Sequence, residues 1–253
     1  MSELRSKDDL AIYRCLTTGT HDAVYNMAVD EALLKCFNAT QAPILRLYSW
    51  SDSFSLGVSQ KIEDYESFCA PHTSFAKRMT GGGVLFHGHD ISYSIIVPSG
   101  VFGALGVKES YERICSFLLV FYEELGLSAV FAKDKKDITL SHSSYCQVGF
   151  EPYDILINDK KIGGNAQRRM KDKIFQHGSI PLKSNDTYQQ MQGYNLQDFG
   201  ISLSLEEATT KLTSAFCKSF AVSLVNSDFT EEEKQTINTL MKEKYANSPH
   251  EKA

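Results

Sequence analysis

The stretch RMTGGGVLFHGHDISYSIIVP, residues 78–98, sets three consecutive glycines before a dense apolar segment. Residues 84–98 predict a strand, a turn and a second strand, with enough apolar side chains for burial. The glycines fit neither the P-loop spacing nor the dinucleotide-binding spacing. They leave backbone N–H groups that no side chain covers, so an extended apolar ligand could lie there. A tight turn without a ligand is the alternative, although the flanking Arg78 and His87 favour a site.

The segments around this stretch predict both helices and strands. Upstream, Asp22 is a suitable N-cap for a helix over 25–37, and residues 42–50 predict a strand. Downstream, the signals predict a helix over 107–125 that stops at Gly126, a hairpin over 153–164 that turns at Asn158-Asp159, a strand over 173–182, and two helices with capping boxes at Ser204/Glu207 and Thr230/Glu233. There are no repeats and no clear linker, so we expect one α+β domain with a mixed β-sheet core flanked by helices.

The composition narrows the class of protein. The 253 residues are 42% hydrophobic and 23% charged, which is ordinary for a soluble globular domain. A net charge of −5 argues against a surface that binds nucleic acid as a whole. The N-terminus lacks the apolar segment of a secretory signal, and no apolar run reaches the roughly 18–20 residues that cross a bilayer.

The six cysteines show no CxxC pair and no Cys/His spacing of a metal site, which predicts reduced thiols in a cytoplasmic protein. Cys36, Cys115 and Cys217 fall in predicted helices, whereas Cys146 lies in the polar, loop-like segment SSYCQVGFEPYD. A thiol is a nucleophile only where it is exposed and a nearby charge or base lowers its pKa. Cys146 is therefore the candidate nucleophile, with an inert loop thiol as the alternative.

A second informative stretch is INDKKIGGNAQRRMKDKIFQHGS, residues 157–179. Lys161 precedes two glycines, where a ligand could approach the backbone, and a lysine aimed into an apolar site would stabilise a thiolate or a carbonyl oxygen. A solvated surface charge is the alternative. Basic residues then follow in an otherwise acidic chain, either as a solvated face or as a docking surface for an acidic protein: Arg168, Arg169, Lys171 and Lys173.

Four motifs together resemble the lipoate/octanoate attachment family, which comprises lipoate–protein ligases and octanoyltransferases related to biotin–protein ligases. The motifs are YNMAVDEALL, WSDSFSLGVSQ, RMTGGGVLFH and KKIGGNAQRR…QHGSI, in the order of the family and over about residues 22–220. The resemblance implies the catalytic-domain fold of biotin and lipoate ligases over residues 1–225. We expect residues 226–253 to form a C-terminal helix and tail, with no separate accessory domain.

Within that family, the chain is most similar to the cysteine-dependent octanoyltransferases. The segment from His87 to Ser94 is one residue shorter than its counterpart in the ligases, and QHGS replaces the HHGT of the ligases. Those transferases have an acidic residue eight positions after their nucleophile, as Asp154 follows Cys146 here, although Gln147 stands where they carry phenylalanine.

The resemblance implies transfer of an octanoyl group from acyl carrier protein to a lysine of a lipoyl-accepting domain, either glycine cleavage H protein or a 2-oxoacid dehydrogenase E2 subunit. Cys146 would carry the acyl group as a thioester, and Lys161 would stabilise negative charge. The residues expected to bind the substrate are Arg78, Gly81, Gly82, Gly83, His87, Gly164, Asn165, Ala166 and His177. We expect a monomer that needs no cofactor or metal and binds neither nucleic acid nor membrane.

Three alternatives stay open at the level of sequence. An ATP-dependent lipoate–protein ligase would activate the free acid. An amidotransferase would move octanoyl between two lipoyl domains with the same cysteine chemistry. A non-catalytic module that binds the carrier protein would tolerate the loss of Cys146 and Lys161.

Overall fold

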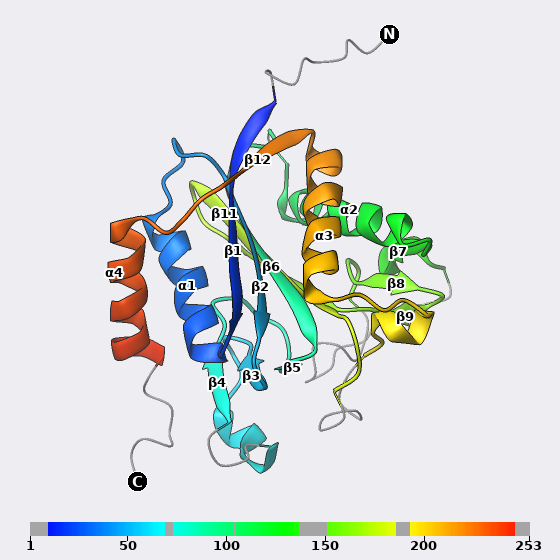
Figure 1. The fold of residues 1–253 in the computed structure, drawn as a ribbon, viewed down its shortest axis with the longest axis horizontal. Helices are drawn as coiled ribbons and strands as arrows, with labels where there is room; N and C mark the ends of the chain where they lie inside the picture. The colour runs from blue at the N-terminus through cyan, green and yellow to red at the C-terminus, as the bar shows by residue number, and fades with distance from the viewer. Residues whose placement is uncertain (1–9, 69–72, 104, 137–150, 186–192, 246–253) are drawn as a thin grey trace.

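A six-stranded mixed sheet forms the centre of the computed structural model, which describes residues 10–68, 73–103, 105–136, 151–185 and 193–245 (Figure 1). In spatial order the strands are β10 (Gly164–Arg169), β11 (Lys173–Pro181), β6 (Asp90–Pro98), β2 (Ile44–Trp50), β1 (Ala11–His21) and β12 (Val222–Asn226). Neighbours from β10 to β2 are antiparallel, whereas β2, β1 and β12 are parallel.

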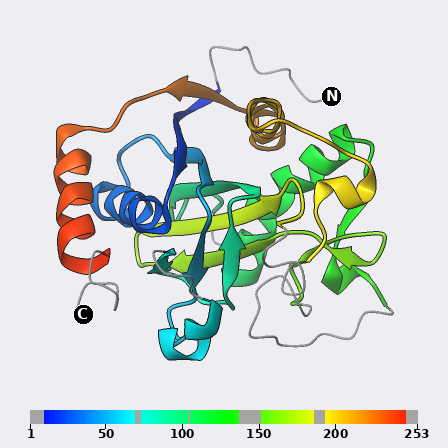
Figure 2. The same ribbon diagram turned by 60° about the horizontal axis from the view of Figure 1, so that its bottom comes forward.

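Helices cover both faces of this sheet. Helices α1 (Ala23–Cys36) and α4 (Glu231–Leu240) lie together on one side, and α2 (Val107–Glu124) and α3 (Leu205–Phe220) lie on the other (Figures 1 and 2). Side chains of β2 pack alternately into the hydrophobic cores on the two faces of the sheet, because successive residues of a strand point to opposite faces. Leu45 and Leu47 pack with α2 and α3, while Ile44 and Tyr48 pack with α1. The predicted mixed sheet flanked by helices is confirmed.

The predicted helix boundaries are confirmed by their caps. The Asp22 carboxylate accepts a hydrogen bond from the backbone N–H of Tyr25 at 2.8 Å. Both predicted capping boxes form, at Ser204 before α3 and at Thr230 before α4. Gly126 follows α2 with a φ of +76°, a conformation that glycine adopts without a steric penalty.

Two three-stranded sheets and several short helical turns complete the described structure. One sheet has the order β4 (Ser74–Lys77), β3 (Ser53–Leu56), β5 (Leu85–His87), and the other the order β7 (Ala129–Phe131), β8 (Ile155–Ile157), β9 (Lys160–Lys161). The short turns are η2 (Ile62–Phe68), η3 (Ala132–Asp134), η5 (Leu196–Phe199) and the π-helical η6 (Met241–Tyr245).

The predicted strand–turn–strand over 84–98 forms, but its two strands join different sheets. β5 pairs with β3, whereas β6 pairs with β2 and β11. The loop of three glycines and His87 therefore lie where the small sheet meets the large one. The predicted hairpin over 153–164 also forms, and Asn158 and Asp159 at its turn have φ values of +50° and +62°.

The sequence patterns above predict neither β1 nor β12. A register shift between Thr17 and Thr20 interrupts the pairing of β1 with β2, so its buried and exposed residues do not alternate regularly. β12 is a short edge strand with exposed residues at its end. No helix in the described part of the chain has the length and apolarity of a segment that crosses a membrane.

Candidate functional site

A small, partly open cavity lies where the loop of three glycines meets β6, β10 and β11. Six of the predicted substrate-binding residues line it, namely Arg78, His87, Gly164, Asn165, Ala166 and His177. Its volume is about 20 Å³, which is room for one or two water molecules. Tyr48, Trp50 and Leu85 contribute most of the bulky apolar or aromatic surface among the other lining residues.

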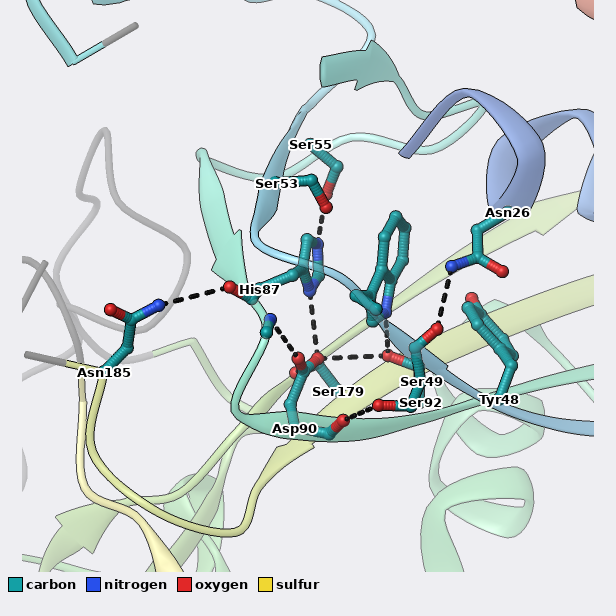
Figure 3. A network of polar contacts seen from close by, with 12 residues as sticks. Asn26, Tyr48, Ser49, Ser53, Ser55, His87, Asp90, Ser92, Ser179 and Asn185 are labelled. Atoms are coloured by element: carbon teal, nitrogen blue, oxygen red, sulfur yellow. Dashed lines mark hydrogen bonds and ion pairs between the residues drawn. The ribbon is translucent and has the colours of Figure 1, made fainter. Parts of the chain in front are cut away.

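One wall of the cavity is a buried chain of hydrogen bonds through His87 (Figure 3). The ring Nε2 of His87 lies 2.8 Å from the Ser55 hydroxyl, and Nδ1 lies 2.9 Å from the Asp90 carboxylate. The Trp50 indole stacks on the imidazole, with 3.8 Å between ring centroids. Both ring nitrogens and one ring face are therefore held, which fixes the orientation of His87.

Asp90 anchors this wall from the start of β6. Its Oδ2 accepts hydrogen bonds from the hydroxyls of Ser179 at 2.6 Å and Ser92 at 3.2 Å, in addition to the contact with His87. Burial raises the pKa of the Asp90 carboxyl, but the charge and hydrogen bonds of His87 outweigh burial and hold that pKa well below its ordinary value. Asp90 is thus an ionised carboxylate in the interior.

Arg78 connects the loop of three glycines to the same wall. Its buried guanidinium donates to the carbonyl and hydroxyl oxygens of Ser55 at 2.7 and 2.8 Å and to the carbonyl of Gly83 at 2.5 Å. A longer contact of 3.4 Å reaches the Gly81 carbonyl. Arg78 therefore holds the loop through its carbonyl groups, a role that the sequence did not indicate.

The three glycines lie beside the cavity and are not among the residues that line it. Gly82 has a φ of +98°, and its carbonyl oxygen would lie 1.9 Å from a Cβ atom at Gly57. The two backbone loops can approach this closely because residue 57 has no Cβ atom, and the positive φ of residue 82 favours glycine there. The predicted contact between the glycines and a ligand stays a prediction.

A second buried carboxylate, Asp30 of α1, contacts two residues that line the cavity, Tyr48 and His177. Its Oδ1 accepts from the Arg46 guanidinium at 2.7 Å and from the Ser94 hydroxyl at 2.8 Å, and its Oδ2 accepts from Tyr48 at 3.0 Å. Burial raises the pKa of the Asp30 carboxyl, yet Arg46 and the hydrogen bonds leave it below the ordinary value. This network ties α1 to β2 and β6.

His177 of β11 joins that network to the glycine loop. Its Nδ1 lies 3.3 Å from Asp30 Oδ2, and its Nε2 lies 2.7 Å from the hydroxyl of Thr80, directly before the glycines. Burial lowers the pKa of His177 below its ordinary value despite the opposing charge of Asp30. A neutral imidazole that donates from Nδ1 and accepts at Nε2 satisfies both contacts.

Lys161 lies in the β8–β9 hairpin and does not line the cavity. Its Nζ forms a 2.6 Å ion pair with Asp154 Oδ2, and both side chains are buried. The backbone N–H of Glu151 also donates to Asp154, at 2.7 Å. Burial raises the pKa of Asp154 and outweighs the opposing charge of Lys161. The catalytic role of Lys161 stays a prediction.

The predicted nucleophile, Cys146, lies outside the described residues. Four other cysteines are described, and burial raises the pKa of each thiol: Cys15, Cys36, Cys115 and Cys217. For Cys115 the pKa reaches about 12. None of these four has the lowered pKa that a nucleophilic thiol requires.

Of the four residues predicted to form a basic surface, Lys173 is not at the surface. Lys173 is buried, and its ammonium group donates to the carbonyl of Phe37 at the C-terminal end of α1, at 2.7 Å. Arg168, Arg169 and Lys171 are exposed. We call these three exposed residues the basic surface from here on.

Asp30 and Arg46 were not predicted from the sequence, although they contact Tyr48 and His177 of the cavity lining. Arg46 is the single charge of ILRLYSW in β2, and Asp30 stands beside Glu31 in the otherwise apolar segment VDEALL of α1. Charged residues are almost never fully buried unless they are paired, so two such positions signal a buried ion pair. Asp90, Trp50 and Ser55 stood within quoted motifs, but the pattern gave no indication of their mutual contacts.

Known proteins are similar to this chain over most of its length. The family model for the lipoyl protein ligase A/B catalytic domain matches residues 22–223. The octanoyltransferase LipM of Kyrpidia tusciae is 30% identical over 260 residues, with 90% of this chain and 94% of the relative covered. The octanoyltransferase LipM of Bacillus subtilis is 34% identical over 181 residues, with 67% of this chain and 65% of the relative covered.

Solved structures share the fold. The putative lipoate protein ligase Ta0514 from T. acidophilum with bound lipoic acid superimposes with a TM-score of 0.79, at 22% identity over 94% of this chain and 98% of that one. A lipoate-protein ligase A bound with ATP gives a TM-score of 0.76, at 22% identity over 93% of this chain and 96% of that one. At this level of identity the likeness concerns the fold alone.

Proposed function

This chain belongs to the family of lipoyl protein ligase A/B catalytic domains, and we propose that it is an octanoyltransferase of lipoate biosynthesis. The proposal rests on relatives named octanoyltransferase LipM that align with most of the chain. In this reaction the donor is octanoyl-acyl carrier protein. The acceptor is a lysine of a lipoyl domain, in glycine cleavage H protein or an E2 subunit. The enzyme acts as a monomer in the cytoplasm and requires no cofactor.

The reaction proceeds in two steps through Cys146. The Cys146 thiolate attacks the carrier thioester, so that a new carbon–sulfur bond forms and the carrier leaves as its thiol. The acceptor amine then attacks the Cys146 thioester, forms an amide and releases the thiolate. Covalent transfer lets two large partners bind one after the other. The raised pKa values of the four described cysteines argue against each of those four as the nucleophile.

Lys161 supplies the positive charge for this chemistry. It is held in the hairpin by Asp154, eight positions after Cys146 in the sequence. In the proposed reaction the ammonium group of Lys161 stabilises the thiolate or the oxyanion of the tetrahedral intermediate.

The cavity between His87 and His177 receives the acyl chain. Burial of each methylene contributes about 0.8 kcal/mol, so a chain of eight carbons gains enough to fix its length. The present volume of about 20 Å³ is too small for this cargo. Substrate binding therefore includes an opening of the cavity, and the polar walls that Asp30 and Asp90 anchor keep their place.

Transfer assays separate the proposal from the alternatives. The chain is incubated with a lipoyl domain and octanoyl-carrier protein without ATP, and in parallel with octanoate and ATP. We expect octanoylated lipoyl domain in the first reaction alone. Product only in the second reaction would instead identify an ATP-dependent ligase. A third reaction, with an octanoylated lipoyl domain as donor, detects amidotransfer.

A further inference from the structure

A second cavity lies behind the His87 wall, at the beginning of α3. Its volume of about 330 Å³ falls in the range of small-molecule sites, roughly 300–1,000 Å³. Residues from five separate segments line it: Ser49 of β2, the turn Gly88–Asp90, Leu182 and Lys183 after β11, Gln197 of η5, and Ser202–Leu205 at the start of α3. The proposed acyl transfer makes no use of this cavity.

The helix that begins at this cavity presents unused backbone donors. α3 has 16 residues and a capping box, in which the backbone N–H groups of Ser204 and Glu207 are bonded to side chains. In the described part of the chain, no acceptor is present for the N–H groups of Leu205 and Glu206. A helix N-terminus with free N–H groups and a positive dipole end attracts anions.

An unpartnered histidine is the independent sign of a ligand. His89 lines the cavity and is only 4% exposed, yet neither of its ring nitrogens makes a hydrogen bond within the described structure. Its backbone is fixed, because the N–H groups of Leu182 and Lys183 both donate to its carbonyl. An unsatisfied buried polar group costs about 1–3 kcal/mol, so a bound ligand would relieve a real penalty.

The charges around the cavity favour an anion. Lys183 is exposed at the rim and free to reach inward. Of the acidic neighbours, Asp90 accepts hydrogen bonds from Ser179 and the backbone N–H of Gly88 and contacts His87, and Glu207 binds the N–H of Ser204. Asp52 adds one negative charge near His89. Backbone N–H groups, an imidazole, an ammonium group and serine hydroxyls thus converge from several directions, as a tetrahedral oxyanion requires.

We propose that this cavity binds a phosphate ester, with His89, Lys183 and the N-terminus of α3 as donors to the phosphate. Its volume leaves room for the organic part of the ester next to Leu203 and Leu205. Two sources share this chemistry. One is a free phosphorylated metabolite, and the other is the phosphodiester of the carrier arm, an assignment that rests on the proposed carrier donor.

Titrations of the full chain with inorganic phosphate and with 4′-phosphopantetheine, followed by calorimetry or amide chemical shifts, test the site. We expect Lys183→Gln to weaken phosphate binding at least about fivefold, because the variant removes a charge-assisted hydrogen bond to the phosphate. His89→Asn is expected to weaken it similarly. Lys61→Gln removes a distant exposed lysine as the matched control and should change affinity less than about twofold.

Lys183 is exposed, so the Lys183→Gln variant still tests the site if His89→Asn fails to fold. Absence of saturable binding by either ligand, or equal binding by wild type and Lys183→Gln, would overturn the proposal. Tighter binding of 4′-phosphopantetheine than of both phosphate and pantetheine assigns the carrier arm. Equal binding of phosphate and 4′-phosphopantetheine assigns a free metabolite. These titrations need no turnover, so their outcome is independent of whether octanoyl transfer is observed.

Discussion

Three buried carboxylates divide the site into two regions of opposite character. In the cavity walls, Asp30 and Asp90 each accept several hydrogen bonds, and the pKa of each is lowered in spite of burial. In the β8–β9 hairpin, Asp154 has one buried lysine and one backbone N–H as partners, and burial raises its pKa. The carboxylates of the walls are therefore strongly stabilised as anions, whereas burial disfavours the charged form of Asp154. We infer that the walls shape the substrate site and that the hairpin side provides the chemistry.

The largest effect is expected at Cys146, the proposed nucleophile. Cys146→Ala should abolish octanoyl transfer, because no acyl-enzyme can form, while the unfolding midpoint stays unchanged. The measurement is the rate of octanoylation of a lipoyl domain. Cys36→Ala, which changes a half-buried thiol of α1, serves as the control and should stay active. Full activity of Cys146→Ala would contradict the proposed acyl-enzyme.

The next effect is expected at Lys161. Lys161→Ala should slow transfer on the order of 10²–10³-fold, the usual loss when one donor to an oxyanion is removed. The adjacent Lys160 is exposed and gives a matched control, since Lys160→Ala removes the same charge from the same strand. Both rates are measured in the same assay at saturating acceptor. Equal rates for the two variants would show that the buried pair is only structural.

A substitution in the cavity wall should change both the stability of the protein and the dependence of that stability on acid pH. Asp90→Ala should lower the free energy of unfolding by about 3–5 kcal/mol, the usual cost of leaving a buried partner uncompensated. The pKa of Asp90 is lowered on folding, so its stabilisation is present above the unfolded pKa of about 3.9 and is lost as pH falls through the folded value. Urea midpoints of wild type should therefore drop below about pH 4, and those of the variant should drop less.

Asp134→Ala provides the surface comparison for that experiment. Asp134 pairs with Lys133 at 2.9 Å, and its side chain is 52% exposed. An exposed pair contributes about 0–1 kcal/mol, so this variant should follow the wild type at every pH. If Asp90→Ala lowers the free energy of unfolding no more than Asp134→Ala does, the buried hydrogen bonds of Asp90 do not stabilise the wall.

The smallest effect is expected at the basic surface. Arg168→Glu combined with Lys171→Glu should slow association with an acidic carrier protein or lipoyl domain about tenfold at low salt and should reduce the salt dependence. Lys173 is left unchanged because it is buried. Stopped-flow association rates at several salt concentrations measure the effect, and Lys61→Glu is the control. Unaltered rates would mean that these residues are only a solvated face.

Much of the fold could be predicted from the sequence because its signals are local. Asp22, Ser204 and Thr230 cap helices within three residues of themselves, and Asn158-Asp159 closes a hairpin on its own. β1 could not be predicted, because its place in the sheet depends on a shifted register with β2. The division of the chain near residue 225 stays a prediction.

The candidate site was predictable in its residue types and not in its contacts. As the motifs suggested, the cavity is lined by Arg78, His87 and His177. Arg78, however, donates hydrogen bonds to carbonyl groups of the glycine loop, and His177 contacts the Asp30 carboxylate. Such contacts join residues up to 147 positions apart in the sequence, and no spacing rule covers that separation.

The central claim is that Cys146 carries the octanoyl group. Wild-type chain is incubated with octanoyl-carrier protein without ATP, its intact mass is measured, and the adduct is mapped by peptide sequencing. We expect one octanoyl group on Cys146, which disappears when a lipoyl domain is added while the acceptor gains the same mass. Transfer to the acceptor with no adduct on Cys146, or with an adduct on another cysteine, would contradict the account.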